Sequence, residues 1–217
     1  MPALFHDCRR DFGRCGAGVF SRLKEVVSNP AMWGVFQYRF QRWVRVSFPR
    51  PIRWLLTPVT IPSQVLMQLL THVQIPSAVR VGPGLYLPHT GPVVIGSGAV
   101  VGAHCTIAHN VTVGHAGGGH RSASHSPVVG DRVYIGPGAI LIGGIAIGDD
   151  ALIGAGAVVA KSIPARGVAV GNPARILSDG GSFDLIEYPG MDSDPARAAS
   201  LAASRSRRNV AIASEAQ

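Results

Sequence analysis

Cysteine is scarce in this chain of 217 residues, and the three cysteines follow no recognisable pattern. Cys8, Cys15 and Cys105 lack the paired spacing of a zinc site, and an odd number argues against a disulfide framework. The sequence also lacks a secretory signal, because charged residues between Asp7 and Asp11 interrupt the start before any apolar run. We therefore expect free thiols and a cytoplasmic protein, with the inner face of the membrane as an alternative location.

No apolar run is long enough to cross a bilayer. The most apolar stretch, from Trp54 to Leu70, contains two prolines and a serine, whereas a spanning helix needs about 20 predominantly apolar residues. The net charge of +8 is also uneven, because residues 1–72 carry ten Arg and Lys against three Asp and Glu. The basic character belongs to this N-terminal segment, and we expect no nucleic-acid partner.

The most prominent feature of the sequence is a hydrophobic repeat with a period of six residues. An aliphatic residue returns at every sixth position, and glycine often follows it. Three runs show this: Ile75, Val81, Leu87; Ile95, Val101, Ile107, Val113; and Val129, Ile135, Leu141, Ile147, Ile153, Val159. Such a period fits neither a helix nor a half-buried strand. It is typical of a coil of short strands with stacked inward side chains, so it predicts a hexapeptide-repeat parallel β-helix over residues 73–177.

The repeat is interrupted twice. Two extra residues lie between Leu87 and Ile95, just after His89. Val113 and Val129 are 16 positions apart instead of six, and a loop of glycine, serine and histidine lies between them. Loops on rigid scaffolds often carry function, so we expect both interruptions to shape a site. His89 stands on a polar corner, where a histidine can accept a proton from a hydroxyl group near neutral pH.

The flanking segments have no period of six. Residues 1–18 are expected to form a loose arm, and residues 19–72 a set of helices broken at Pro30, Pro49, Pro51, Pro58 and Pro62. Aromatic residues and arginines alternate in the stretch MWGVFQYRFQRWVRV. This stretch would either lie on a membrane surface or, as we favour, cover the exposed edge of the first coil or a neighbouring subunit. Residues 178–217 are expected to be a disordered tail.

The residues around both interruptions resemble a known family. The stretch VQIPSAVRVGPGLYLPHTGPVVIG, the extruded glycine-rich loop and the closing GNPARI are similar to the serine acetyltransferase branch of the hexapeptide-repeat acyltransferases. The resemblance covers residues 73–177, about half of the chain. It implies an all-β left-handed parallel β-helix with a short α-helical N-terminal segment. It also implies a homotrimer, with acetyl-CoA as co-substrate in the groove between adjacent β-helices.

The resemblance further implies roles for individual residues. The histidine that matches His89 is the general base, and Gln74 stands where the family has an aspartate that orients this histidine. Backbone amides near Gly117 and Gly118 are expected to hold the oxyanion. Lys161 would bind CoA phosphates as a cation. The other implied residues are Pro137, Ala155 and Arg175 for CoA, and His109, His125 and Ser126 for the acceptor.

The chain departs from the family where the family binds the charged groups of serine. Pro88 and Asn29 replace two acids, and His125-Ser126 replaces an Arg-His pair. A zwitterion without charged partners loses buried hydrogen bonds. The pattern therefore favours a neutral sugar hydroxyl of an exopolysaccharide or its precursor, as in the colanic-acid-type polysaccharide O-acetyltransferases. Serine O-acetylation is the alternative.

Two other classes of protein were weighed. The spacing His104-x4-His109 imitates the zinc site of the γ-type carbonic anhydrases, in which three imidazoles must converge on the metal. In that family the ligand histidine directly follows the coil glycine, whereas His104 follows Gly102-Ala103, so we expect no metal. A non-catalytic scaffold would leave the two interruptions without an explanation.

Overall fold

The coil that the repeat predicts is present, and its turns contribute short strands to three sheets. The computed structural model describes residues 2–15, 18–115 and 125–215. Sheet A contains β1 (Val73–Gln74), β3 (Val93–Ile95), β6 (Val111–Gly114), β9 (Ile140–Ile142) and β12 (Val158–Val159). Sheet B contains β2 (Arg80–Val81), β4 (Val100–Val101), β7 (Val128–Val129) and β10 (Ala146–Ile147). Sheet C contains β5 (Thr106–Ile107), β8 (Tyr134–Ile135), β11 (Leu152–Ile153), β13 (Val168–Val170) and β14 (Arg175–Ser178).

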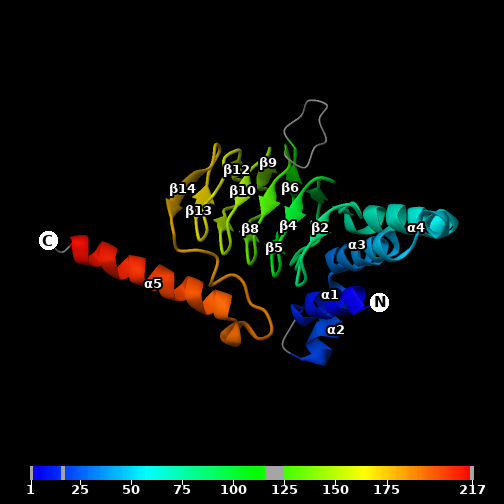
Figure 1. The fold of residues 1–217 in the computed structure, drawn as a ribbon, viewed down its shortest axis with the longest axis horizontal. Coiled ribbons are helices and arrows are strands. Elements are labelled where there is room, and N and C mark those ends of the chain that lie inside the picture. The colour runs from blue at the N-terminus through cyan, green and yellow to red at the C-terminus, as the bar shows by residue number, and fades with distance from the viewer. Residues whose placement is uncertain (1, 16–17, 116–124, 216–217) are drawn as a thin grey trace.

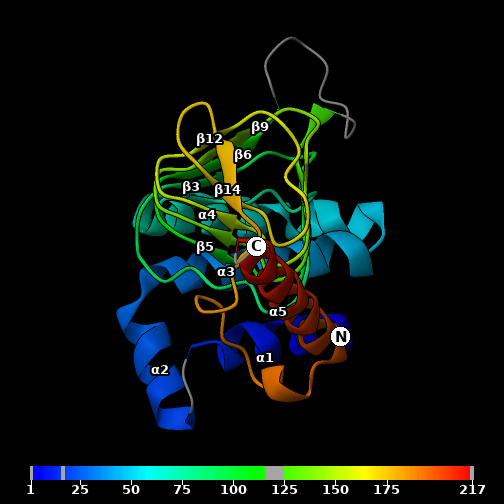
Figure 2. The ribbon, with the colours of Figure 1, turned by 90° about the vertical axis from the view of Figure 1, so that its left-hand side faces the viewer.

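The chain visits sheets A, B and C in turn, so the coil has three recurring corners. We call them the A–B, B–C and C–A corners after the sheets that they join. Strand pairs along the coil are parallel, except that β14 runs antiparallel to β13. Figure 1 shows the coil from the side, and Figure 2 looks along it, so that successive turns overlap.

The residues that return at every sixth place point into the coil. All thirteen are buried, with exposed fractions of 6% or less. Ile107, Ile135 and Ile153 stack on one another because β5, β8 and β11 pair in register. Glycine beside this ladder allows close backbone contact: at Gly102 a Cβ atom would overlap the carbonyl oxygen of Gly130. The predicted parallel β-helix of hexapeptide repeats is therefore confirmed.

Helices cover the N-terminal end of the coil (Figure 1). They are α1 (Pro2–Gly13), α2 (Val19–Ser28), α3 (Pro30–Ser47) and α4 (Arg50–Thr71). Met32, Val35 and Tyr38 of α3 are buried in the same core as the first coil. The Tyr38 hydroxyl donates a hydrogen bond to the carbonyl oxygen of Val79 at 2.8 Å. The interpretation of this aromatic stretch as a cover for the first coil is confirmed.

The loose arm expected over residues 1–18 is wrong for most of its length, because α1 is a helix anchored to the coil. Asp11 is fully buried and accepts hydrogen bonds from the backbone N–H groups of Gly84 (2.7 Å) and Leu85 (2.8 Å). Its carboxylate also pairs with Arg39 of α3, at 2.8 Å from Nε. These partners are distant in sequence, so local composition gives no sign of them.

Helix α4 is longer than the prolines predict. The expected breaks at Pro58 and Pro62 are wrong, because the helix continues through both residues. A proline frees the carbonyl group four residues earlier, and these two prolines lie on the exposed side of the helix, where water can satisfy that group. None of the helices in the described parts of the chain is long and apolar enough to cross a membrane.

The disordered tail expected over residues 178–217 is also wrong. After β14 the chain returns along the B–C corner, where Ser182 donates a hydrogen bond to the carbonyl oxygen of Arg132 at 2.6 Å. Phe183 and Ile186 are buried, and Arg197 holds this segment through both of their carbonyl groups. A short 3-10 helix, η2 (Met191–Ser193), leads into α5 (Pro195–Glu215), which points away from the N-terminal helices and extends past the C-terminal end of the coil (Figure 1). The few apolar residues of this segment suffice because the coil supplies the rest of the core.

Candidate active site

Four of the residues expected at the site lie in one column along the C–A corner. They are His89, His109, Pro137 and Ala155, and each precedes a strand of sheet A. Backbone hydrogen bonds tie successive turns of this corner together. The N–H of Gly138 donates to the carbonyl of His109 at 3.0 Å, and the N–H of Gly156 donates to that of Pro137 at 2.8 Å. The corner is therefore a rigid column with the candidate base at its N-terminal end.

His89 is exposed and faces a second histidine. The ring centroids of His89 and His109 lie 5.8 Å apart in an edge-on arrangement of 76°. The Nδ1 atom of His109 is buried and has no hydrogen-bond partner among the described residues. Gly91, in the two-residue bulge, makes this approach possible. Its φ is +151°, and a Cβ atom there would lie 2.8 Å from the Cβ of His109.

Gln74 lies on the strand beside this corner. It is exposed on β1 and pairs through its backbone with Val94 of β3. No hydrogen bond joins the side chains of Gln74 and His89. The imidazole of His89 instead makes a ring contact with His109. The orienting role of Gln74 stays a prediction.

Sequence analysis missed a carboxylate next to the strand that leads into His89. The amide nitrogen of Asn29 donates to the carbonyl of Leu87 at 2.8 Å and to Oε1 of Glu25 at 3.1 Å. The hydroxyl of Tyr86 donates to the same Glu25 oxygen at 3.0 Å. Burial and this carboxylate raise the pKa of Tyr86. Glu25 is far from His89 in the sequence, and no motif marks it.

The remaining expected residues lie elsewhere on the coil. His125, Ser126 and Lys161 are at the A–B corner, across sheet A from His89, with Ser126 buried and Lys161 exposed. Arg175 begins β14 and is exposed; its Nη1 donates to the carbonyl of Ala174 at 3.1 Å. Gly117 and Gly118 lie outside the described residues. One chain therefore places some of the expected residues at each edge of sheet A and does not bring them together.

His104 lies at a third place, the B–C corner, so it does not converge with His109. Arg10 donates to its Nε2 at 3.3 Å, and its ring stacks on Tyr188 with centroids 4.1 Å apart. Burial, with Arg14 and Arg10 nearby, lowers the pKa of His104 to about 4. The arrangement does not fit the γ-type zinc site, and the described residues contain no cluster of three metal-ligating side chains.

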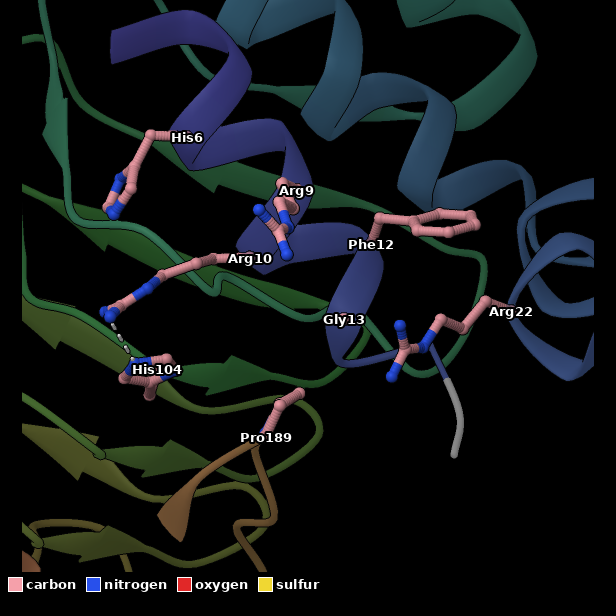
Figure 3. Close-up of a pocket in the computed structure, with 8 residues that line it drawn as sticks. All are labelled: His6, Arg9, Arg10, Phe12, Gly13, Arg22, His104 and Pro189. Atoms are coloured by element: carbon pink, nitrogen blue, oxygen red, sulfur yellow. Dashed lines mark hydrogen bonds between the residues drawn. The ribbon is translucent and has the colours of Figure 1, made fainter. Parts of the chain in front are cut away.

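A cavity lies beside His104, away from the C–A corner. It has a volume of about 510 Å³. Figure 3 shows the residues that line it: His6, Arg9, Arg10, Phe12, Gly13, Arg22, His104 and Pro189. This cavity lies at the B–C corner, whereas His89, His109, Pro137 and Ala155 lie at the C–A corner.

Comparison with known sequences adds a family to this geometry. The family described as "Bacterial transferase hexapeptide (six repeats)" matches residues 126–161. Serine acetyltransferase of Mycobacterium tuberculosis is 36% identical over 167 residues, which cover 75% of this chain and 69% of that protein. Serine acetyltransferase of Synechococcus elongatus is 38% identical over 133 residues, 61% of this chain and 54% of that protein. The match to the Synechococcus protein thus spans only about half of that protein's length.

Comparison with solved structures agrees. The soybean serine acetyltransferase apoenzyme is 30% identical, with a TM-score of 0.70, and the match covers 82% of this chain and 70% of that one. A match of this extent is longer than the β-helix, so it includes flanking segments as well as the coil.

Proposed function

This chain belongs to the serine acetyltransferase family and is an acetyltransferase of the hexapeptide-repeat class, and from this premise we propose that it transfers the acetyl group of acetyl-CoA to the hydroxyl of L-serine. The observation that carries the choice of acceptor is the 36% identity to the M. tuberculosis enzyme across 75% of the chain. These relatives favour serine over the sugar hydroxyl that the sequence alone favours.

His89 is the proposed general base. It is exposed on a rigid corner, so an acceptor hydroxyl can reach its ring. A neutral imidazole there accepts the hydroxyl proton as the oxygen attacks the thioester carbon, and the C–S bond then breaks. The proton can pass to the departing CoA sulfur, which leaves the histidine neutral again. Backbone N–H groups would stabilise the oxyanion formed in between.

Glu25 is the proposed partner for the ammonium group of serine. Asn29 occupies the position of a family acid, but its amide nitrogen is already bonded to Leu87 and Glu25. Its amide oxygen accepts from the N–H of Ala31 at 3.2 Å, which caps α3. The carboxylate of Glu25 therefore restores beside Asn29 the negative charge that the substitution removes.

Assembly would complete the site. His89, Pro137 and Ala155 lie on one edge of sheet A, and His125 and Lys161 on the other. In a left-handed homotrimer the A–B corner of one copy can face the C–A corner of the next. CoA would then lie in the groove between copies, with Lys161 and Arg175 as cations for its phosphates.

A sugar hydroxyl is the second candidate acceptor, because Gln74, Pro88 and Asn29 are all uncharged. The test is release of CoA thiol from acetyl-CoA with L-serine, N-acetylserine or a panel of neutral glycans. Serine acetylation predicts saturable turnover of L-serine and little of N-acetylserine, which lacks the ammonium group. Turnover of glycans alone would reject serine and support the second candidate.

A variant sharpens the test. Glu25→Gln should raise the KM for L-serine at least tenfold, as expected for loss of a charge-assisted hydrogen bond. Glu187→Gln, at an exposed acid far from His89, is the matched control. An unchanged KM for serine in Glu25→Gln would remove Glu25 from the acceptor site but leave the acetyl-transfer reaction in place.

A further inference from the structure

Helix α4 turns its apolar side to solvent. Its contacts with α3 are polar: Gln37 donates to the Ser63 hydroxyl at 2.9 Å, and Gln41 donates to the carbonyl of Thr60 at 3.1 Å. Its large apolar side chains that are 41% or more exposed are Ile52, Trp54, Leu55, Val59, Ile61, Val65, Leu66, Leu69 and Leu70. A helix on a protein core normally has the opposite polarity. We call the exposed residues in this list the α4 face.

The α4 face spans most of a 22-residue helix, which is about 33 Å at 1.5 Å per residue. Trp54 and Leu55 are 82% and 80% exposed, so the core of the protein does not account for them. A continuous exposed apolar surface of this kind usually marks an interaction site.

The charge around the α4 face has one sign. No Asp or Glu occurs between Glu25 and Asp131 in the sequence. Of the five arginines in α3 and α4, Arg39 pairs with Asp7 and Asp11. The other four have no carboxylate partner among the described residues: Arg42, Arg45, Arg50 and Arg53.

These arginines gather at one end of the α4 face. Arg53 donates to the backbone carbonyl of Arg45 at 3.3 Å, which ties the start of α4 to the end of α3, where Arg45 and Arg50 are exposed. Arg42 donates instead to the carbonyl of Ser77 on the coil at 3.2 Å. Arg45 and Arg53 also line a polar cavity of about 180 Å³ between the two helices. A tryptophan beside arginines, followed by aliphatic residues, matches the chemistry of a membrane interface.

We propose that α4 lies on the surface of an anionic lipid bilayer, with the α4 face among the acyl chains and the exposed Arg45 and Arg50 at the phosphate groups. The helix is too polar on its other side to span the bilayer, and it binds in the plane of the interface. The inference is independent of the acceptor. It has a consequence for access, because α4 leads through His72 directly into β1 and the edge of sheet A.

A bilayer fits the charges better than a second copy of the chain does. Two copies joined through this helix would bring two acid-free arginine clusters into one interface, and like charges there oppose association. An anionic membrane supplies the missing negative charge as well as the apolar medium. The same argument predicts that binding weakens as salt is raised.

The experiment uses the full chain and two kinds of vesicle, one of phosphatidylcholine and one of phosphatidylcholine with phosphatidylglycerol. The wild type should float with the phosphatidylglycerol vesicles and remain unbound with the neutral ones. Leu55→Ser/Leu69→Ser should reduce binding at least tenfold. Ile176→Ser/Leu177→Ser, which removes two exposed apolar residues of β14 at the opposite end of the coil, is the matched control and should bind as the wild type does.

The arginines and the tryptophan give two further readouts. Arg45→Gln/Arg50→Gln should lose the preference for phosphatidylglycerol and its salt dependence, whereas Arg205→Gln on α5 should not. Fluorescence should shift to the blue on vesicle binding, and Trp54→Phe should abolish the shift. Failure of the wild type to prefer phosphatidylglycerol vesicles would overturn the proposal. So would a Leu55→Ser/Leu69→Ser protein that binds vesicles normally but sediments as a smaller assembly, which would identify the α4 face as a contact between copies.

Discussion

The C–A and B–C corners of the coil both carry histidine, and the two corners use it in opposite ways. At the C–A corner His89 is exposed, and its ring meets that of His109 edge-on. At the B–C corner His104 is 8% exposed, stacks on Tyr188 and receives a hydrogen bond from Arg10. The same scaffold therefore presents one histidine to solvent and fixes another inside a contact between distant segments.

The difference lies in what covers each corner. Helix α1 and the segment before α5 both pack on the B–C corner, through Arg10, Arg14 and Tyr188. Among the described residues, no segment covers His89 in this way. A repeat sequence thus gives equivalent backbone positions, and the flanking segments decide which of them remain open for chemistry.

The largest expected difference between the two corners is in the effect of replacing their histidines on catalysis. His89→Ala should lower kcat/KM for acetyl transfer by about 10²–10⁴, the range for loss of a positioned general base. CoA release with saturating acetyl-CoA measures the rate, and calorimetry with CoA measures binding, which should stay nearly intact.

The matched control is His104→Gln, which replaces a buried imidazole by an uncharged group that can still accept from Arg10. Its kcat/KM at neutral pH should remain within a few-fold of wild type. The comparison of corners would fail if His104→Gln lost as much activity as His89→Ala while its CD spectrum stayed native.

The second prediction concerns stability against pH. Burial and the neighbouring arginines lower the pKa of His104 from 6.5 to about 4. Protons then favour the unfolded chain, so this contribution to stability is complete above about pH 6.5 and is lost as pH falls toward 4. At pH 5 the loss should be about 2 kcal/mol. Urea unfolding of wild type and His104→Gln at pH 7.5 and pH 5 measures it.

The double difference isolates His104, because other groups titrate equally in both proteins. The wild type should lose about 2 kcal/mol more than His104→Gln over this interval. Equal losses in both proteins would mean that the B–C corner does not keep His104 neutral.

The coil could be predicted from the sequence because its information is local and periodic. Leu141 and Ile153 are buried where the period of six places them, and His89, His109, Pro137 and Ala155 form a column because residues at one corner stack. The role of α1 could not be predicted in this way. Asp11 acts through Arg39 and the backbone of Gly84, partners that no local pattern connects.

Glu25 and the C-terminal segment escaped prediction for the same physical reason. A carboxylate on a short helix is usually solvated, and only the fold brings Glu25 to Tyr86 and Asn29. Phe183, Ile186 and Tyr188 are too few to make a core of their own, so their composition resembles a disordered tail. They become buried because the B–C corner offers the complementary surface.

The smallest expected effect comes from adding a charge beside His89. Gln74→Asp places a carboxylate on β1 of sheet A, the strand that pairs with β3, which follows His89. His104 lies at a different corner. A nearby carboxylate favours the protonated imidazole, so the acidic limb of the rate–pH profile should move to higher pH by about one unit or less. Gln74→Asn is the control, because it has the size of aspartate without its charge and should leave the limb in place.

The loss of stability between pH 7.5 and pH 5 should be nearly the same in both variants as in the wild type, since it depends on His104 at the other corner. A shift of equal size in Gln74→Asn would mean that side-chain length at position 74, and not charge, sets the profile.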